Sequence, residues 1–231
     1  RLFPDYPLTR IDRDTTRRSG ELERLLDTVH SEQSRILLGT QMLTKGHHFP
    51  GVTMVAIIDS DQGLFGTDFR SSERLAQAIV QVAGRAGRAE RAGEVWIQTY
   101  YPDHPLLQTL LTEGYGNFAR KALDERRSAG WPPFNHLVLL RGECAERDRL
   151  FRFLDAARAC ATDAGSQIRI LGPATAPMER RSGRYRGQLL LQSVQRIELQ
   201  RFLPEWHNRL GKLADARRVR WSLDVDPIEL F

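Results

Sequence analysis

Two arginines stand three residues apart in the stretch Gln81-Val-Ala-Gly-Arg85-Ala-Gly-Arg88, at the end of an apolar segment with helical spacing. Positions i and i+3 of a helix share one face, so both guanidinium groups can point at a single target. Gln81 lies four residues before Arg85, on the same side. A planar guanidinium is always charged and suits phosphate oxygens better than a lysine does. The pattern favours a phosphate contact, and a solvated basic helix end is the alternative.

The elements that must position these arginines alternate between strands and helices. We expect strands over residues 7–11, 35–39, 52–58 and 93–100, and helices over residues 20–31 and through Gln81. This alternation predicts a parallel α/β sheet over residues 1–102. The apolar run at 52–58 is typical of a parallel strand covered on both faces. Functional residues of such a sheet belong at the carboxyl ends of its strands.

A polar loop follows the second expected strand and reads Thr40-Gln41-Met-Leu-Thr-Lys45-Gly46-His-His48. It lies at a carboxyl end, where backbone amides, a hydroxyl group and Lys45 can hold a phosphate. An ordinary loop between a strand and a helix is the alternative.

The second half of the chain changes pattern. Residues 103–135 predict a connecting helix, broken near Gly114 and Gly116, and a rigid turn at 130–134 in which Trp131 is better suited to packing than to base stacking. Residues 136–231 show the order strand, helix, strand, strand, helix, strand, with strands at 137–141, 167–171, 185–192 and 219–225 and helices at 147–164 and 197–210. This order predicts a small α+β sandwich that is ferredoxin-like or close to it.

A basic hairpin is expected between the middle strands of this α+β domain. Its arginines can neutralise several phosphates, and its tyrosine can stack on an unpaired base. A solvated hairpin tip is the alternative. The residues concerned are Arg180, Arg181, Arg184, Tyr185 and Arg186. On the last helix, Arg196 and Gln200 are four residues apart and form a candidate contact for a protein partner, although the pattern favours a plain surface.

Composition narrows the class of protein. The 231 residues carry a formal net charge of +5, which suits a polyanionic partner without establishing one. No apolar run reaches the length of a membrane span. Cys144 and Cys160 form no C-x-x-C pair, so we expect neither a disulfide nor a metal site, and a reducing cytoplasm. The first residue is Arg1 rather than Met, and we expect a piece of a longer protein.

Taken in order, these motifs resemble the second lobe of superfamily 2 helicases. The Gly-Thr-Gln-Met strand end with its Lys-Gly-His-His-Phe-Pro loop is similar to motif V, and Gln-Val-Ala-Gly-Arg-Ala-Gly-Arg is similar to motif VI. The resemblance implies that Arg85 and Arg88 reach the γ-phosphate of ATP bound on the other lobe, where arginine fingers are worth roughly 10³–10⁵ in rate. It implies that Gln81 positions the γ-phosphate or its attacking water. It also implies nucleotide contacts by Gly46 and His48, although many relatives have Asp at the latter position, and DNA contacts by Thr40, Gln41 and Lys45.

The individual residues within these motifs indicate a narrower family than the superfamily. I-L-L-G-T-Q-M-L-T-K-G-H-H-F-P, D-x-D-x-x-L-F-x-x-D-F-R-x-x-E-R and the tail L-D-V-D-P-I together resemble the primosomal protein N′ (PriA) family. The resemblance implies an ATP-dependent 3′→5′ DNA helicase that recognises stalled or branched replication forks and initiates primosome assembly. It also implies ATP, Mg²⁺ and Zn²⁺ in the full-length protein. The implied partners are branched and single-stranded DNA, the single-stranded-DNA-binding protein and other primosome proteins, around a monomeric, cytoplasmic and nucleoid-associated protein.

Two motifs that such an enzyme needs are missing from this sequence. There is no G-x-x-x-x-G-K-[ST] loop and no paired C-x-x-C motif. We therefore expect this chain alone to bind ATP poorly and to hydrolyse none. Two other functions stay open: a non-catalytic scaffold that binds forks and loads primosome proteins, and a double-stranded-DNA translocase from another branch of superfamily 2.

Overall fold

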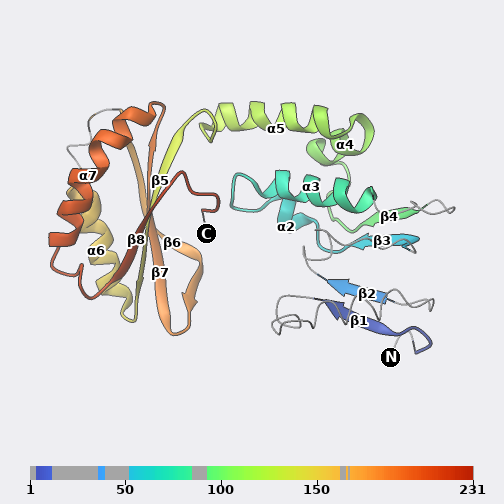
Figure 1. Ribbon diagram of the computed structural model, residues 1–231, viewed down its shortest axis with the longest axis horizontal. Coiled ribbons are helices and arrows are strands. Elements are labelled where there is room, and N and C mark those ends of the chain that lie inside the picture. Colours follow the sequence, from blue (N-terminus) through green and yellow to red (C-terminus); the bar gives the residue numbers. More distant parts are fainter. Residues whose placement is uncertain are drawn as a thin grey trace. The chain divides into compact units, whose positions relative to one another are not determined.

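The computed structural model describes residues 4–11, 36–39, 52–84, 93–161, 165 and 167–230, and the chain divides into two compact units (Figure 1). The first unit comprises residues 1–66 and 71–118, and the second comprises residues 67–70 and 119–231. The helix expected over residues 20–31 lies outside the described residues. Among the helices in the described ranges, none is long and apolar enough to cross a lipid bilayer.

The strands of the first unit pair in parallel, as the alternating pattern predicts. β1 (Leu8–Ile11) pairs with β2 (Ile36–Gly39), and β3 (Met54–Ile57) pairs with β4 (Glu94–Ile97). Each strand falls within its expected range. The expectation that residues 52–58 are covered on both faces is wrong, because the β3 side chains alternate in burial and Met54 is 59% exposed. Helix α3 (Ser71–Ala83) packs against this pair, and the side chains that point the other way stay exposed.

Helix α3 buries Ala76 and Ile79, while Gln81 in its last turn is exposed. The short helix α2 (Asp61–Leu64) follows β3. Its Asp61 accepts hydrogen bonds from the Thr99 hydroxyl at 2.5 Å and from the Tyr100 backbone N–H at 3.0 Å. The Asp61 carboxylate, just after β3, therefore holds the segment that follows β4 through two hydrogen bonds.

Two helices continue the chain after β4. α4 (Pro105–Glu113) starts with proline at a position where the missing N–H costs nothing, and buries Leu106, Leu107 and Leu110. It stops at Gly114, whose φ of 81° is easily reached only without a side chain. α5 (Tyr115–Ala129) then begins. The break predicted near Gly114 is confirmed.

The second unit has the predicted order of elements. β5 (His136–Cys144), α6 (Arg147–Ala159), β6 (Arg169–Arg181), β7 (Arg184–Ser193), α7 (Arg196–Lys212) and β8 (Arg220–Val225) follow one another. The strands form one antiparallel sheet in the order β6-β7-β5-β8. Both helices lie on the same side of this sheet (Figure 1), which gives the two-layer sandwich expected from the sequence.

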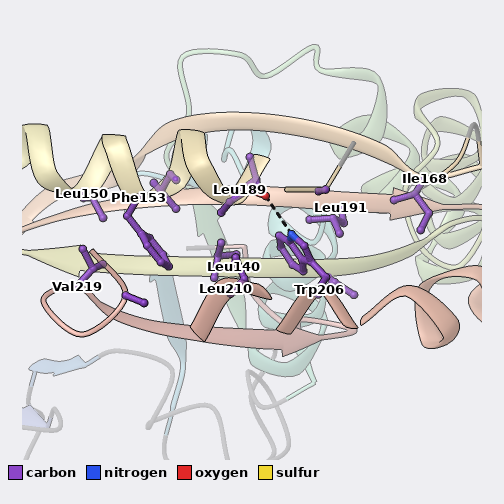
Figure 2. Close-up of a cluster of buried hydrophobic side chains, with 14 of the residues drawn as sticks. Leu140, Leu150, Phe153, Ile168, Leu189, Leu191, Trp206, Leu210 and Val219 are labelled. Atoms are coloured by element: carbon purple, nitrogen blue, oxygen red, sulfur yellow. Dashed lines mark hydrogen bonds between the residues drawn. The ribbon is translucent and has the colours of Figure 1, made fainter. Parts of the chain in front are cut away.

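The main core lies between the sheet and these two helices, on the side that we call the helix face. Successive strand residues point to opposite sides, so alternate residues of β5 and β7 reach this core. Trp206 of α7 is fully buried within it and donates its ring N–H to the carbonyl oxygen of Ala157 on α6 at 3.1 Å (Figure 2). Further members include Val138, Leu140, Leu150, Phe153, Leu154, Leu189, Leu191 and Leu210.

The opposite side of the sheet, which we call the second face, is covered at one end by a smaller apolar cluster. Leu137, Leu139 and Leu190 pack there with Leu230, Trp131 and Phe69. The Phe69 and Trp131 rings stack at a centroid distance of 5.6 Å. Asp68 accepts hydrogen bonds from the backbone N–H groups of Arg70 and Leu230. Trp131 is therefore a packing residue, as expected.

We predict that Gly142→Val lowers the free energy of unfolding by about 1–3 kcal/mol. Gly142 faces Gly187 across β5 and β7, and a Cβ at position 142 would lie 2.7 Å from Cδ1 of the buried Leu150. Valine is the better strand former, so a loss would show that the close approach of α6 outweighs strand propensity.

Urea-induced unfolding measures the effect, with Ser222→Val as control. Ser222 is exposed on β8, and the same valine there should change stability by less than about 0.5 kcal/mol. Equal stability of the two variants would contradict the role of the glycine.

Candidate nucleic-acid interface

The predicted basic hairpin is formed by β6 and β7. Arg181 pairs with Arg184, and the two residues between them, Ser182 and Gly183, have φ angles of 49° and 79°. Two consecutive positive φ angles define the tight turn whose twist matches that of the flanking strands. The sequence Ser-Gly therefore places one arginine on each strand immediately beside the turn.

The register of the hairpin divides the predicted binding residues between the two faces of the sheet. Tyr185 lies opposite Cys144 and packs against the main core on the helix face, with Arg180 over its ring at 5.1 Å from the centroid. Arg184 and Arg186 alternate with Tyr185 and point to the second face. The geometry therefore favours a packing role for Tyr185 and leaves its stacking on a base as a prediction.

Four arginines gather on the second face at the end of the sheet nearest the hairpin turn. Arg186 and Arg220 both lie opposite Glu143, on β7 and β8 respectively, and Arg181 and Arg184 continue the group toward the turn. We call these four arginines and Glu143 the basic end. Glu143, Arg181, Ser182, Arg184 and Arg220 line a pocket of about 280 Å³.

The basic end has an excess of positive charge that the surrounding chain does not neutralise. Glu143 pairs with Arg186, whose Nε lies 3.4 Å from Oε1. Within the described residues, no carboxylate pairs with Arg181, Arg184 or Arg220. Elsewhere in the unit several arginines pair with a carboxylate. Such pairs join Arg141 to Asp224, Arg149 and Arg152 to Asp215, Arg196 to Asp226, and Arg209 to Glu205.

This arrangement is suited to phosphate groups. Arginine donates hydrogen bonds in a planar fork that matches phosphate oxygens, and it stays charged at any physiological pH. Contacts of this kind hold a nucleic-acid backbone without reading its sequence. The pairing of the strands also brings the backbone positions of these arginines together at one end of the sheet.

Other predicted site residues lie outside the described part of the chain. These are Thr40, Gln41, Lys45, Gly46, His48, Arg85 and Arg88. The remaining predicted residue of the ATP site, Gln81, is described and is exposed near the end of α3.

The candidate partner contact on α7 is also described. Arg196 and Gln200 are both exposed, and Arg196 Nη2 lies 3.1 Å from Oδ2 of Asp226. A partner that bound Arg196 through a carboxylate would compete with Asp226. The contact stays a prediction.

Sequence reasoning missed Arg220 and Glu143. A signal for the first was present, because Arg217-Arg218-Val219-Arg220 is a basic run that leads into β8. The pairing of β5 with both β7 and β8 brings this run beside the hairpin, and a single sequence does not reveal that pairing. Arg217 and Arg218 are exposed in the turn just before this strand.

The described residues show no group of three or more His, Cys, Asp or Glu side chains that could hold a metal ion. Cys144 is buried and free, and burial raises the pKa of the free Cys160 thiol, which favours the protonated form at neutral pH.

Comparison with protein families assigns both halves of the chain. Residues 3–90 match the helicase conserved C-terminal domain, and residues 127–228 match the primosomal protein N C-terminal domain. The basic hairpin and β8 both fall within the second match. A de novo designed protein, Foldit4, aligns with 40% of the chain at a TM-score of 0.33 and 10% identity, a likeness too weak to inform the fold.

Curated relatives match almost the whole chain. The replication restart protein PriA of Haemophilus influenzae is 47% identical over 99% of this chain and 31% of its own length. The proteins of the same name from Synechocystis sp. and Bacillus subtilis are 38% and 35% identical over 99% and 98% of the chain, and 27% and 28% of their own lengths. The chain thus spans about a third of the length of these relatives. It belongs to the replication restart protein PriA family, of which it carries the helicase C-terminal domain and the primosomal protein N C-terminal domain.

Proposed function

We propose that this chain is the DNA-binding and ATP-site-completing part of an ATP-dependent 3′→5′ DNA helicase that recognises stalled replication forks and starts primosome assembly. The observation that carries the proposal is the group of unpaired arginines at the basic end, within a chain whose two halves match a helicase domain and a primosomal domain in that order. Membership of the PriA family supplies the link to restart.

In this proposal the first unit serves the motor. Arg85 and Arg88 reach the γ-phosphate of ATP held with Mg²⁺ mainly by another lobe, and Gln81 positions the phosphate or the attacking water. Gly46 and His48 contact the nucleotide. The first unit contacts one DNA strand through Thr40, Gln41 and Lys45.

The second unit supplies a binding site for the DNA of the fork. Its basic end neutralises backbone phosphates, so the contact is strong at low salt and independent of sequence. A protein that acts wherever replication stops needs this kind of contact, because the sequence at the stalled fork differs from site to site. This binding site lies within one unit and needs no ATP, which is why a fork-binding scaffold stays the second candidate function.

Partners and location follow from the same proposal. Branched and single-stranded DNA are the substrates, and the single-stranded-DNA-binding protein and other primosome proteins are candidate partners, with Arg196 and Gln200 as a candidate contact. We place the protein in the cytoplasm with the nucleoid. Zn²⁺ belongs to the full-length protein.

We predict that Arg85→Ala or Arg88→Ala in the intact protein lowers DNA-stimulated ATP hydrolysis and unwinding by about 10³-fold or more, as expected for an arginine finger. A strand-displacement assay on a forked substrate measures the effect, and binding of the same fork is the control. Normal unwinding by both variants would contradict the motor role. Loss of unwinding with unimpaired restart would favour the scaffold.

The 231-residue chain alone should hydrolyse no ATP in the presence of DNA, because it lacks a phosphate-binding G-x-x-x-x-G-K-[ST] loop. A phosphate-release assay with and without single-stranded DNA tests this. Turnover above the background of an Arg85→Ala sample would show that the chain contains a complete ATP site.

Replacing Arg181 and Arg184 together by Ala should weaken DNA binding and reduce the slope of log K against log salt by roughly 1, because the two arginines line one pocket and each lost phosphate contact contributes about 0.9. Fluorescence anisotropy over a salt series measures the slope. The matched control is Arg169→Ala with Arg201→Ala, which removes the same charge far from the turn on β6 and from α7. Equal slopes for the two double variants would contradict a localised interface.

A further inference from the structure

The pocket at the basic end has no assigned ligand. We propose that it binds one phosphate group, and that this group is a phosphodiester of the bound DNA. The identity of the ligand rests on the proposed DNA-binding function. The pocket residues are Arg181, Ser182, Arg184, Arg220 and Glu143.

The charge around the pocket favours an anion. Three guanidinium groups surround one pocket, and none of them pairs with a carboxylate in the described chain. Like charges held together raise the energy of the unbound protein, and an anion between them relieves this repulsion. The volume of about 280 Å³ is enough for several water molecules and therefore for a phosphate group.

The arginines around the pocket come from strands on both sides of β5. Arg181 and Arg184 face each other beside the turn, whereas Arg220 comes from β8, on the other side of β5. Neighbouring strands lie about 4.8 Å apart, so the arginines reach the pocket from opposite flanks. A group bound between them is gripped from two sides, while a backbone that merely passed along the hairpin would leave Arg220 unused.

Glu143 limits where in the pocket an anion can lie. It lies opposite both Arg186 and Arg220 on the sheet, and its carboxylate holds Arg186 at 3.4 Å. The pair removes Arg186 from the pocket and places a negative wall beside it. The carboxylate repels any anion, so a phosphate group in the pocket lies nearer to the three arginines than to Glu143, which makes Glu143 a positioning residue.

The test is a scan with neutral phosphates. A set of forked DNA molecules is prepared in which one phosphate at a time is replaced by a methylphosphonate, which keeps the shape and removes the charge. The binding of each to the 231-residue chain is compared with its binding to Arg220→Ala and to Arg169→Ala. Arg169 is exposed at the opposite end of β6, and like Arg220 it has no ion-pair partner in the described structure, so it controls for the loss of charge alone.

We expect one or a few adjacent phosphates whose neutralisation weakens binding to the wild-type chain and to Arg169→Ala by about tenfold, the usual scale of one hydrogen bond to a charged group. The same neutralisation should weaken the binding of Arg220→Ala less than that of the wild type, because one of the three arginine contacts with that phosphate has already been lost. Glu143→Gln should tighten binding of unmodified DNA by weakening the negative wall.

Two results would overturn the inference in different ways. If DNA binds but the cost of every methylphosphonate is the same for Arg220→Ala as for wild type, the pocket holds no phosphate and the wider DNA surface stands. If DNA does not bind at all, inorganic phosphate is titrated while the side-chain Nε–H resonance of Arg220 is followed by NMR. Saturation there would mean a site for free phosphate, which contradicts both the DNA ligand and the proposed function.

Discussion

The second unit depends on the packing of α6 and α7 against the same face of its sheet. Gly142 and Gly187 let α6 approach closely, and Trp206 joins the two helices through its hydrogen bond to Ala157. Because side chains alternate along each strand, filling one face with apolar residues fixes which residues must point the other way. The location of the arginines on the second face is therefore a consequence of the core.

The second face is apolar at one end of the sheet and positively charged at the other. At one end, Leu139 and Leu190 are covered by Phe69, Trp131 and Leu230, so that end is used for packing. At the other end the arginines outnumber the carboxylate among them, and Glu143 is already paired with Arg186. Surface ion pairs contribute little to stability, so leaving three arginines unpaired costs the fold little and creates a place for an anion. The apolar cluster and the unpaired arginines therefore occupy different ends of one surface.

Much of this fold could be predicted from the sequence because its signals are local. The period-two alternation around Trp221, the Ser-Gly turn and the glycine break at Gly114 each act over a few residues. The register of strand pairing depends on distant parts of the chain. It determines that Tyr185 faces the core while Arg184 faces outward. Arg220 escaped notice for the same reason, since it joins the hairpin only through the pairing of β5 with two neighbours. The motif residues Arg85 and Arg88 were predicted from spacing and resemblance, and they lie outside the described residues.

Mapping backbone amide chemical shifts during a DNA titration tests most directly whether DNA lies against the basic end. We predict that the largest changes fall on Glu143, on residues 181–186 and on residues 217–220, with little change at Arg169 on the same sheet. Changes concentrated on α7, or spread evenly over all exposed arginines, would contradict it.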